Sequence, residues 1–123
     1  MDDVELEEIL PIISRAEVGG LGIALANPRH GHEVEVIARR GLPDDMKLIA
    51  GVLDTTTNYV EHPRVVAMRL QAAVRAMGDV SRVLASPDCG FGTMVGYQPV
   101  VPNVVWDKLA SLRAGADLAI AEL

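Results

Sequence analysis

The fold is decided by residues 47–78, KLIAGVLDTTTNYVEHPRVVAMRLQAAVRAMG, where an apolar run is followed by a polar loop and an amphipathic segment. The run at 47–53 predicts a buried strand that ends at Asp54. Pro63 suits the first position of a helix, and Gly78 suits the residue after its last turn. Apolar residues recur at helical spacing between them, namely Val66, Leu70, Ala73 and Met77. The stretch therefore predicts a strand, a polar loop and a helix, and residues 61–63 are expected only to start that helix.

The flanking sequence continues this alternation of strands and helices. Upstream, we expect a helix at 2–14 with Leu6, Ile9, Leu10 and Ile13 on one face, a strand at 18–26, a strand or helix start at 34–38, and a turn at 41–45. Downstream, we expect a strand at 82–86 and a helix from about Asn103, with an apolar stripe of Val105, Leu109, Leu112, Ala116 and Ala119. Such an order predicts the α/β class with parallel βα units. The residues alone leave two arrangements open, a small open α/β sandwich and an incomplete part of a β/α barrel.

Length and composition exclude several classes of protein. The 123 residues fit one domain, 1–123, and half of them are apolar, which excludes a disordered chain. The net charge of −6 and the scattered basic residues argue against a nucleic-acid partner. The acidic N-terminus does not resemble a signal peptide, and no apolar run is long enough to span a bilayer. Cys89 is the single cysteine, so no intrachain disulfide can form. We expect a cytoplasmic protein without a membrane partner.

Polar residues follow each of the three expected strands, where parallel α/β proteins bind their ligands. His30, His32 and Glu33 are metal-ligand types, although the same residues also suit a solvated loop. Arg29 and His30 could equally bind an anion or a substrate. Asp54 could hold a substrate amine or hydroxyl, or it could cap its loop. Cys89 precedes a glycine-rich loop and suits a zinc ligand, a nucleophile or a buried thiol.

Three motifs, taken in order, resemble the C-terminal part of the cobalamin-independent methionine synthase family. They are ANPRHGHE at 26–33, LIAGVLDTTTNYVEHPRVVAMRL at 48–70 and SPDCGFGT at 86–93, and VVWDKLASLRAGADLA at 104–119 is similar to the family's last helix. The resemblance covers nearly the whole chain. It implies the last strands and helices of a TIM (β/α)8 barrel, and it makes Asn27 and Asp88 further substrate-binding candidates beside Arg29, His30, His32, Glu33 and Asp54.

The resemblance also implies a chemistry, alkyl transfer to a thiol such as homocysteine, in which zinc activates the thiol. The family binds zinc through a His and a Cys of an earlier strand, a Glu, and the Cys of the PDCG motif, which Cys89 matches. Ala24 stands where the family has the Glu, and Thr56 stands where it has a catalytic His. Zinc therefore remains a possible cofactor, with Cys89 as its matched ligand.

Three hypotheses follow from this comparison of motifs. The chain could transfer methyl or alkyl groups with a partner chain that supplies the missing barrel half. It could be a non-catalytic homologue that binds a small molecule or a protein. It could also be a metal-free enzyme that uses His30, His32, Glu33 and Asp54. Because a few barrel strands would leave open edges and an uncovered face, we expect either a homo-oligomer or a complex with that partner chain.

Overall fold

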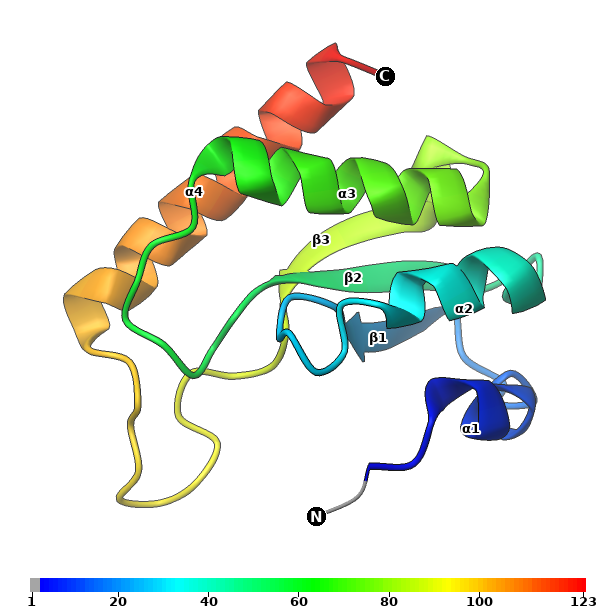
Figure 1. Ribbon diagram of the computed structural model, residues 1–123, viewed down its shortest axis with the longest axis horizontal. Helices are drawn as coiled ribbons and strands as arrows, with labels where there is room; N and C mark the ends of the chain where they lie inside the picture. The colour runs from blue at the N-terminus through cyan, green and yellow to red at the C-terminus, as the bar shows by residue number, and fades with distance from the viewer. Residues whose placement is uncertain (1–2) are drawn as a thin grey trace.

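The computed structural model describes residues 3–123 and contains four α-helices, one 3₁₀ turn and three strands within that range (Figure 1). Their bounds are α1 Leu6–Ile13, β1 Gly20–Ala24, α2 Glu33–Arg40, β2 Lys47–Leu53, α3 Pro63–Met77, η1 Val80–Arg82, β3 Val83–Pro87 and α4 Pro102–Ala121. The strands form one parallel sheet in the order β1-β2-β3. The predicted α/β fold of parallel βα units is confirmed.

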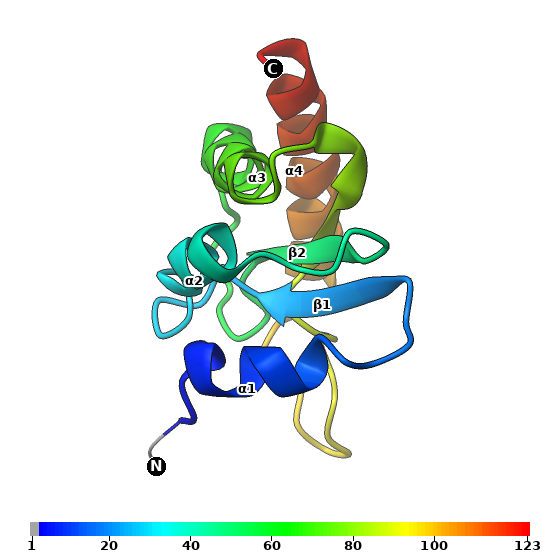
Figure 2. The same ribbon diagram turned by 90° about the vertical axis from the view of Figure 1, so that its right-hand side faces the viewer.

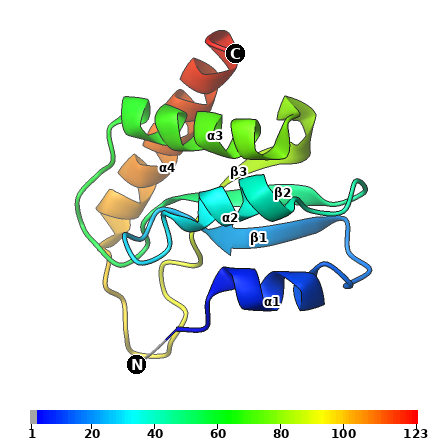
Figure 3. The same cartoon turned by 45° about the vertical axis from the view of Figure 1, so that its right-hand side comes forward.

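The core lies between the central strand and the helices that cover it. Leu48, Ala50 and Val52 of β2 are fully buried, because β2 is paired on both sides and covered by α3. The views agree that α2 and α3 lie side by side, that α4 packs along α3, and that α1 runs alongside β1 (Figures 2 and 3). The core is aliphatic, and its other fully buried members include Ile37, Leu53, Val66, Ala67 and Ala73.

Most sequence-based boundaries agree with the structure. Strand β2 and helix α3 occupy the expected residues, and Gly78 follows α3 in the left-handed conformation with φ 76°. The ambiguous residues 34–38 belong to helix α2. The first expected helix is shorter, since α1 begins at Leu6, and its expected first residue at position 2 lies outside the described residues.

The apolar stripe predicted for α4 lies beside the core, but it is not the most buried face of the helix. The residues buried on it are Lys108, Ser111, Gly115 and Ala119, so only Ala119 of the expected stripe is fully buried. The backbone of α4 approaches α3 closely at Gly115, where an added Cβ would lie 2.4 Å from Val66 Cβ. The helix therefore turns its smallest and most polar positions toward α3, and the larger aliphatic side chains flank them.

The N-terminal ends of the strands are tied together by one arginine. Arg82, which immediately precedes β3, donates from Nη2 to the carbonyl oxygens of Pro43 at 2.7 Å and Met46 at 2.9 Å. These contacts join β3 to the turn before β2, at the end of the sheet opposite to the polar loops.

Both outer strands of the sheet have an unpaired edge within the described residues. Leu84 of β3 is 49% exposed, and an apolar groove of about 340 Å³ lies between β3 and the C-terminal half of α4. Within residues 3–123, none of the helices combines the length and hydropathy that a membrane span requires.

Candidate functional site

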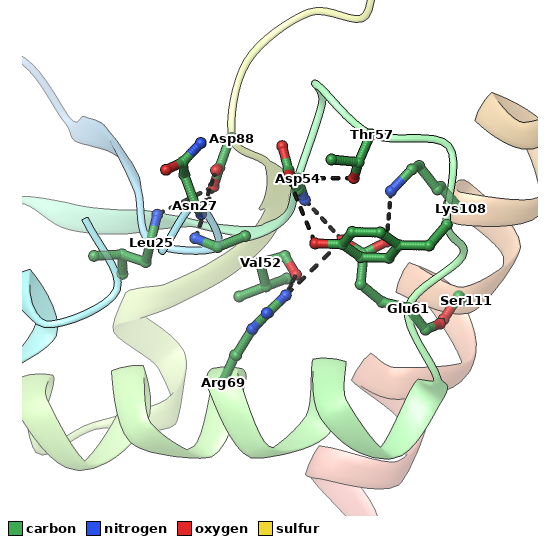
Figure 4. A network of polar contacts seen from close by, with 12 residues as sticks. Leu25, Asn27, Val52, Asp54, Thr57, Glu61, Arg69, Asp88, Lys108 and Ser111 are labelled. Atoms are coloured by element: carbon green, nitrogen blue, oxygen red, sulfur yellow. Dashed lines mark hydrogen bonds and ion pairs between the residues drawn. The ribbon is translucent and has the colours of Figure 1, made fainter. Parts of the chain in front are cut away.

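The loops after β1 and β3 are joined by the carboxylate of Asp88. Its Oδ1 accepts hydrogen bonds from the amides of Leu25 at 3.1 Å and Ala26 at 3.0 Å, and its Oδ2 accepts one from Asn27 at 2.9 Å (Figure 4). Burial raises the pKa of Asp88 above its ordinary value, and the three amide hydrogen bonds only partly oppose that effect. The geometry shows Asp88 acting on the backbone of the loop, while its predicted contact with a substrate stays a prediction.

Asp88 can approach the sheet only because β2 carries a glycine beneath it. A Cβ at Gly51 would lie 2.5 Å from Asp88 Oδ1 and 2.9 Å from the carbonyl oxygen of Ile23. Both distances are shorter than carbon–oxygen contacts allow, so any side chain at this position would displace the carboxylate or β1. The position of the Asp88 carboxylate therefore requires a glycine at residue 51.

Asp54, directly after β2, is 3% exposed and is surrounded by hydroxyl donors. Its Oδ1 accepts from the amide of Thr56 at 2.9 Å and from its hydroxyl at 2.8 Å. The contacts of Oδ2 are longer, 3.2 Å from Thr57 Oγ1 and 3.4 Å from Tyr59 Oη. Burial raises the pKa of Asp54, but the hydrogen bonds from Thr56 and Thr57 and the charge of Lys108 outweigh it and leave the pKa below its ordinary value.

A buried ion pair lies behind Asp54. Glu61 Oε2 accepts a hydrogen bond from the Asp54 amide at 2.7 Å, and Glu61 Oε1 lies 2.7 Å from the ammonium of Lys108 (Figure 4). Arg69 approaches Glu61 Oε2 at 3.8 Å and donates to the carbonyl oxygen of Val52 at 3.0 Å. The expectation that residues 61–63 only start a helix is therefore incomplete, since Glu61 also organises the end of β2.

Sequence reasoning missed this pair because its two residues are 47 positions apart and each resembles a surface charge. One signal was available. Lys108 and Ser111 are spaced as neighbours on one helix face, and Gly115 continues the same face one turn later. A small residue on the line of a lone lysine indicates a close helix contact that buries the charge.

Cys89 is exposed and lies against the end of β2. Its Sγ is 2.9 Å from Thr55 Oγ1 and 3.4 Å from the carbonyl oxygen of Gly90. Thr55 is buried, so the hydroxyl fixes the thiol from the protein side and leaves its other side open. Thr55 is a further site residue that sequence reasoning overlooked.

The predicted site residues of the loop after β1, other than Asn27, contact acidic side chains at the start of α2 and in the segment before α1. His30 Nδ1 lies 3.3 Å from Glu33 Oε1, whereas His32 Nε2 lies 3.9 Å from Glu5 Oε2. Arg29 forms an ion pair with Asp3. Asn27 Oδ1 accepts from the amide of Arg29 at 3.0 Å and so shapes the loop. These residues, Asn27 excepted, line a polar pocket of about 410 Å³ at the outer surface, beside the segment that precedes α1.

The donor set of residues 3–123 does not fit a zinc site. Across residues 3–123, no three side chains of His, Cys, Asp or Glu are grouped so that they could hold a metal ion. The polar partners of Cys89 are Thr55 and a carbonyl group, and Ala24 occupies the last position of β1. Structural and catalytic zinc sites need three or four protein ligands. Cys89 would therefore need ligands from outside these residues.

No model of a known protein family and no curated protein matches the chain. A solved structure does match it, that of a B12-independent methionine synthase from Shewanella sp. W3-18-1 in complex with selenomethionine. The superposition has a TM-score of 0.73 at 26% identity and covers 94% of this chain. The chain is similar to part of a methionine synthase.

This structural match supports the resemblance of the sequence motifs and favours one of the two predicted architectures. The chain spans 30% of the length of the methionine synthase that it matches. Of the two arrangements that the sequence left open, the incomplete β/α barrel is the one that the match supports. The resemblance that the three motifs carry is confirmed at the level of the fold.

Proposed function

We propose that this chain is a methionine synthase-like module that binds a sulfur-containing amino acid at Asp54 and takes part in alkyl transfer to a thiol only together with a partner chain. The observation that carries the proposal is the buried carboxylate of Asp54 at the C-terminal end of β2, in a fold similar to a methionine synthase. The solved relative was crystallised with selenomethionine, which makes methionine and homocysteine the first ligands to test.

Asp54 has the properties that an ammonium group requires. Its lowered pKa keeps it ionised at neutral pH, and its Oδ1 is fixed by Thr56. The longer contacts of Oδ2 make this oxygen the one that a ligand would take. Because Tyr59 is 52% exposed, its side chain can turn outward and give up the 3.4 Å contact to an incoming amine.

The requirement for a partner follows from what the strand ends contain. Cys89 offers one thiol, and Thr56 uses its hydroxyl on Asp54. The polar contacts of His30 and His32 are with Glu33 at the start of α2 and with acidic residues that precede α1, and these residues line a separate pocket. A chain that adds strands to the open edges of β1 or β3 would bring additional residues to these strand ends.

Calorimetric titration with L-methionine and L-homocysteine tests the binding step. We expect binding by the wild-type chain that weakens about 10- to 100-fold in Asp54→Asn, since a hydrogen bond to a charged group contributes about 1.5–3 kcal/mol. Asp45→Asn, at an exposed turn, is the matched control and should bind like the wild type. Equal affinity in Asp54→Asn and the wild type would exclude Asp54 as the amine site.

Metal content and oligomeric state test the partner. We expect the isolated chain to hold much less than one zinc per chain after metal-replete purification and to show no methyl transfer. Stoichiometric zinc that is lost in Cys89→Ser would show instead that copies of this chain complete the site by themselves. Light scattering after size-exclusion chromatography measures whether such copies associate, and a stable monomer at high concentration would exclude the homo-oligomer.

A second candidate function is that of a non-catalytic binding protein. It is favoured by Ala24, which cannot ligate a metal, and by Thr56, whose hydroxyl is directed to Asp54. The two functions differ in one measurement. Alkyl transfer in the presence of a co-expressed chain that resembles the missing half supports the first, and ligand binding that persists without any such activity supports the second.

A further inference from the structure

The charges of Lys108 and Glu61 are expensive for a protein of this size. Lys108 is 0% exposed and Glu61 is 4% exposed, so both charges have lost nearly all of their contact with water. A buried ion pair recovers its desolvation cost only with good geometry, and apolar residues of similar volume often serve stability as well or better. Packing alone therefore does not explain why two charged residues are buried here.

The contacts of the pair lead to Asp54 along two routes. Glu61 receives the ammonium of Lys108 on one oxygen and the amide of Asp54 on the other, both at 2.7 Å. The ammonium of Lys108 also lies 4.9 Å from the centre of the Tyr59 ring, and the hydroxyl of Tyr59 reaches Asp54 Oδ2. One route holds the backbone of Asp54 and the other approaches its side chain.

The pair is itself held in place. Ser111, one turn after Lys108 on α4, donates its hydroxyl to the carbonyl oxygen of Glu61. Arg69 of α3 approaches Glu61 Oε2 and binds the last part of β2 through Val52. Two helices therefore fix Glu61, and Glu61 fixes the first residue after β2.

We propose that Glu61 and Lys108 are positioning residues of the strand-end site, which hold Asp54 in the orientation in which its Oδ2 receives an amine. Helix α4 thereby becomes part of the site through Lys108, whose ammonium is hydrogen-bonded to Glu61. This proposal rests on the proposed function for the identity of its ligand, but the arrangement of Asp54 can be measured in the absence of any ligand.

The test compares Lys108→Met with Arg82→Met, because both remove a cation that is bound to the protein interior. Arg82 ties the opposite end of the sheet, so its loss lowers stability without touching Asp54. The double variant Glu61→Gln/Lys108→Met removes both charges, leaves no buried charge without a partner, and serves if Lys108→Met does not fold. Lys108→Arg restores the charge.

Two measurements distinguish positioning from stability alone. The first is the titration of the Asp54 side-chain carboxyl by carbon NMR, which should shift to higher pH in Lys108→Met, because a nearby cation is lost, recover in part in Lys108→Arg, and stay unchanged in Arg82→Met. In the double variant, which removes an anion and a cation together, the readout is the affinity for L-methionine, which should fall at least tenfold. The second is affinity for L-methionine at a temperature where all variants are folded, which should fall at least tenfold in Lys108→Met and less than threefold in Arg82→Met.

The outcomes separate this proposal from the proposed function. An Asp54 titration that is the same in the wild type and in folded Lys108→Met, or an unchanged affinity for L-methionine in the folded double variant, would overturn the positioning role. A shifted titration in a protein that binds no methionine would leave the positioning of Asp54 standing and would overturn the ligand instead.

Discussion

Replacing Gly115 by alanine should destabilise the fold, although the same change in a helix normally does the opposite. Alanine has a higher helix propensity than glycine, worth about 1 kcal/mol in the middle of a helix. At Gly115 the new Cβ would lie 2.4 Å from both Cβ and Cγ1 of Val66, and 2.8 Å from the carbonyl oxygen of Pro63. Carbon atoms pack at about 3.5 Å or more, so α3 and α4 would have to separate by about 1 Å.

The magnitude follows from two opposing terms. Inserting a methyl group into a packed contact costs about 1–3 kcal/mol, and here the displaced atoms belong to a branched side chain and a backbone carbonyl group rather than to a flexible side-chain end. We expect the upper half of that range to exceed the propensity gain and leave a net loss of about 1–2 kcal/mol. In a domain of this size, that loss lowers Tm by roughly 3–10 °C.

Urea unfolding followed by circular dichroism at 25 °C measures the change. Ala114→Gly, at the exposed neighbouring position of α4, calibrates the propensity term and should cost about 1 kcal/mol. Gly22→Ala is the control for an added methyl group, because nothing lies within 4 Å of the Cβ it would add. If Gly115→Ala proved more stable than the wild type, the close approach of α3 and α4 would be refuted, and with it the burial of Lys108 on the same helix face.

Three further predictions concern the strand ends and the helix start. Asp88→Ala should destabilise the protein by about 3 kcal/mol or more, since three amides lose their acceptor, and chemical denaturation should show a much smaller effect for Asp45→Ala. Because folding lowers the pKa of Asp54, this carboxylate contributes to stability above pH 3.8, and the contribution is lost as the pH falls through its folded-state pKa. Thr56→Ala should raise the folded-state pKa, so acid-denaturation curves should show the loss of stability at higher pH than in the wild type. His62→Ala should cost about 1 kcal/mol, because His62 Nδ1 accepts the amide of Arg64 at 3.0 Å and so caps α3, while His62→Asp should retain the cap and keep the wild-type Tm within a few degrees.

The parts of the fold that sequence predicted well are those fixed by local chemistry. Strand β2 is a continuous apolar run, and α3 begins at a proline and ends at a left-handed glycine, so both ends of each element are marked. The segment at 34–38 was ambiguous because the short helix begins with Glu33-Val34-Glu35-Val36, which alternates polar and apolar residues as a strand does. The most buried positions of α4 were not predicted because a tertiary contact, the approach to α3 at Gly115, decides them.

The site was predictable in its location but only partly in its contacts. Parallel strands bring their C-terminal ends to the same end of the sheet, so Asn27, Asp54 and Asp88 were expected to be neighbours once the strands were recognised. Which of them faces a ligand depends on side-chain directions that the spacing in sequence does not encode. The ion pair of Glu61 with Lys108 depends on the crossing of two helices. The spacing of Lys108, Ser111 and Gly115 marks the contacting face of α4 but does not identify Glu61 as the partner.

The motifs that carry the resemblance turn out to contain much of the scaffold. Asp88 of the PDCG motif binds three backbone amides, Asn27 of the ANPRH motif shapes its own loop, and Gly51 makes room for Asp88. Residues of this kind preserve the strand-end geometry whatever reaction the site performs. The resemblance implies that the chemistry of the family depends instead on positions such as those of Ala24 and Thr56, where this sequence differs. The shared motifs therefore argue more strongly for a common fold than for a common reaction.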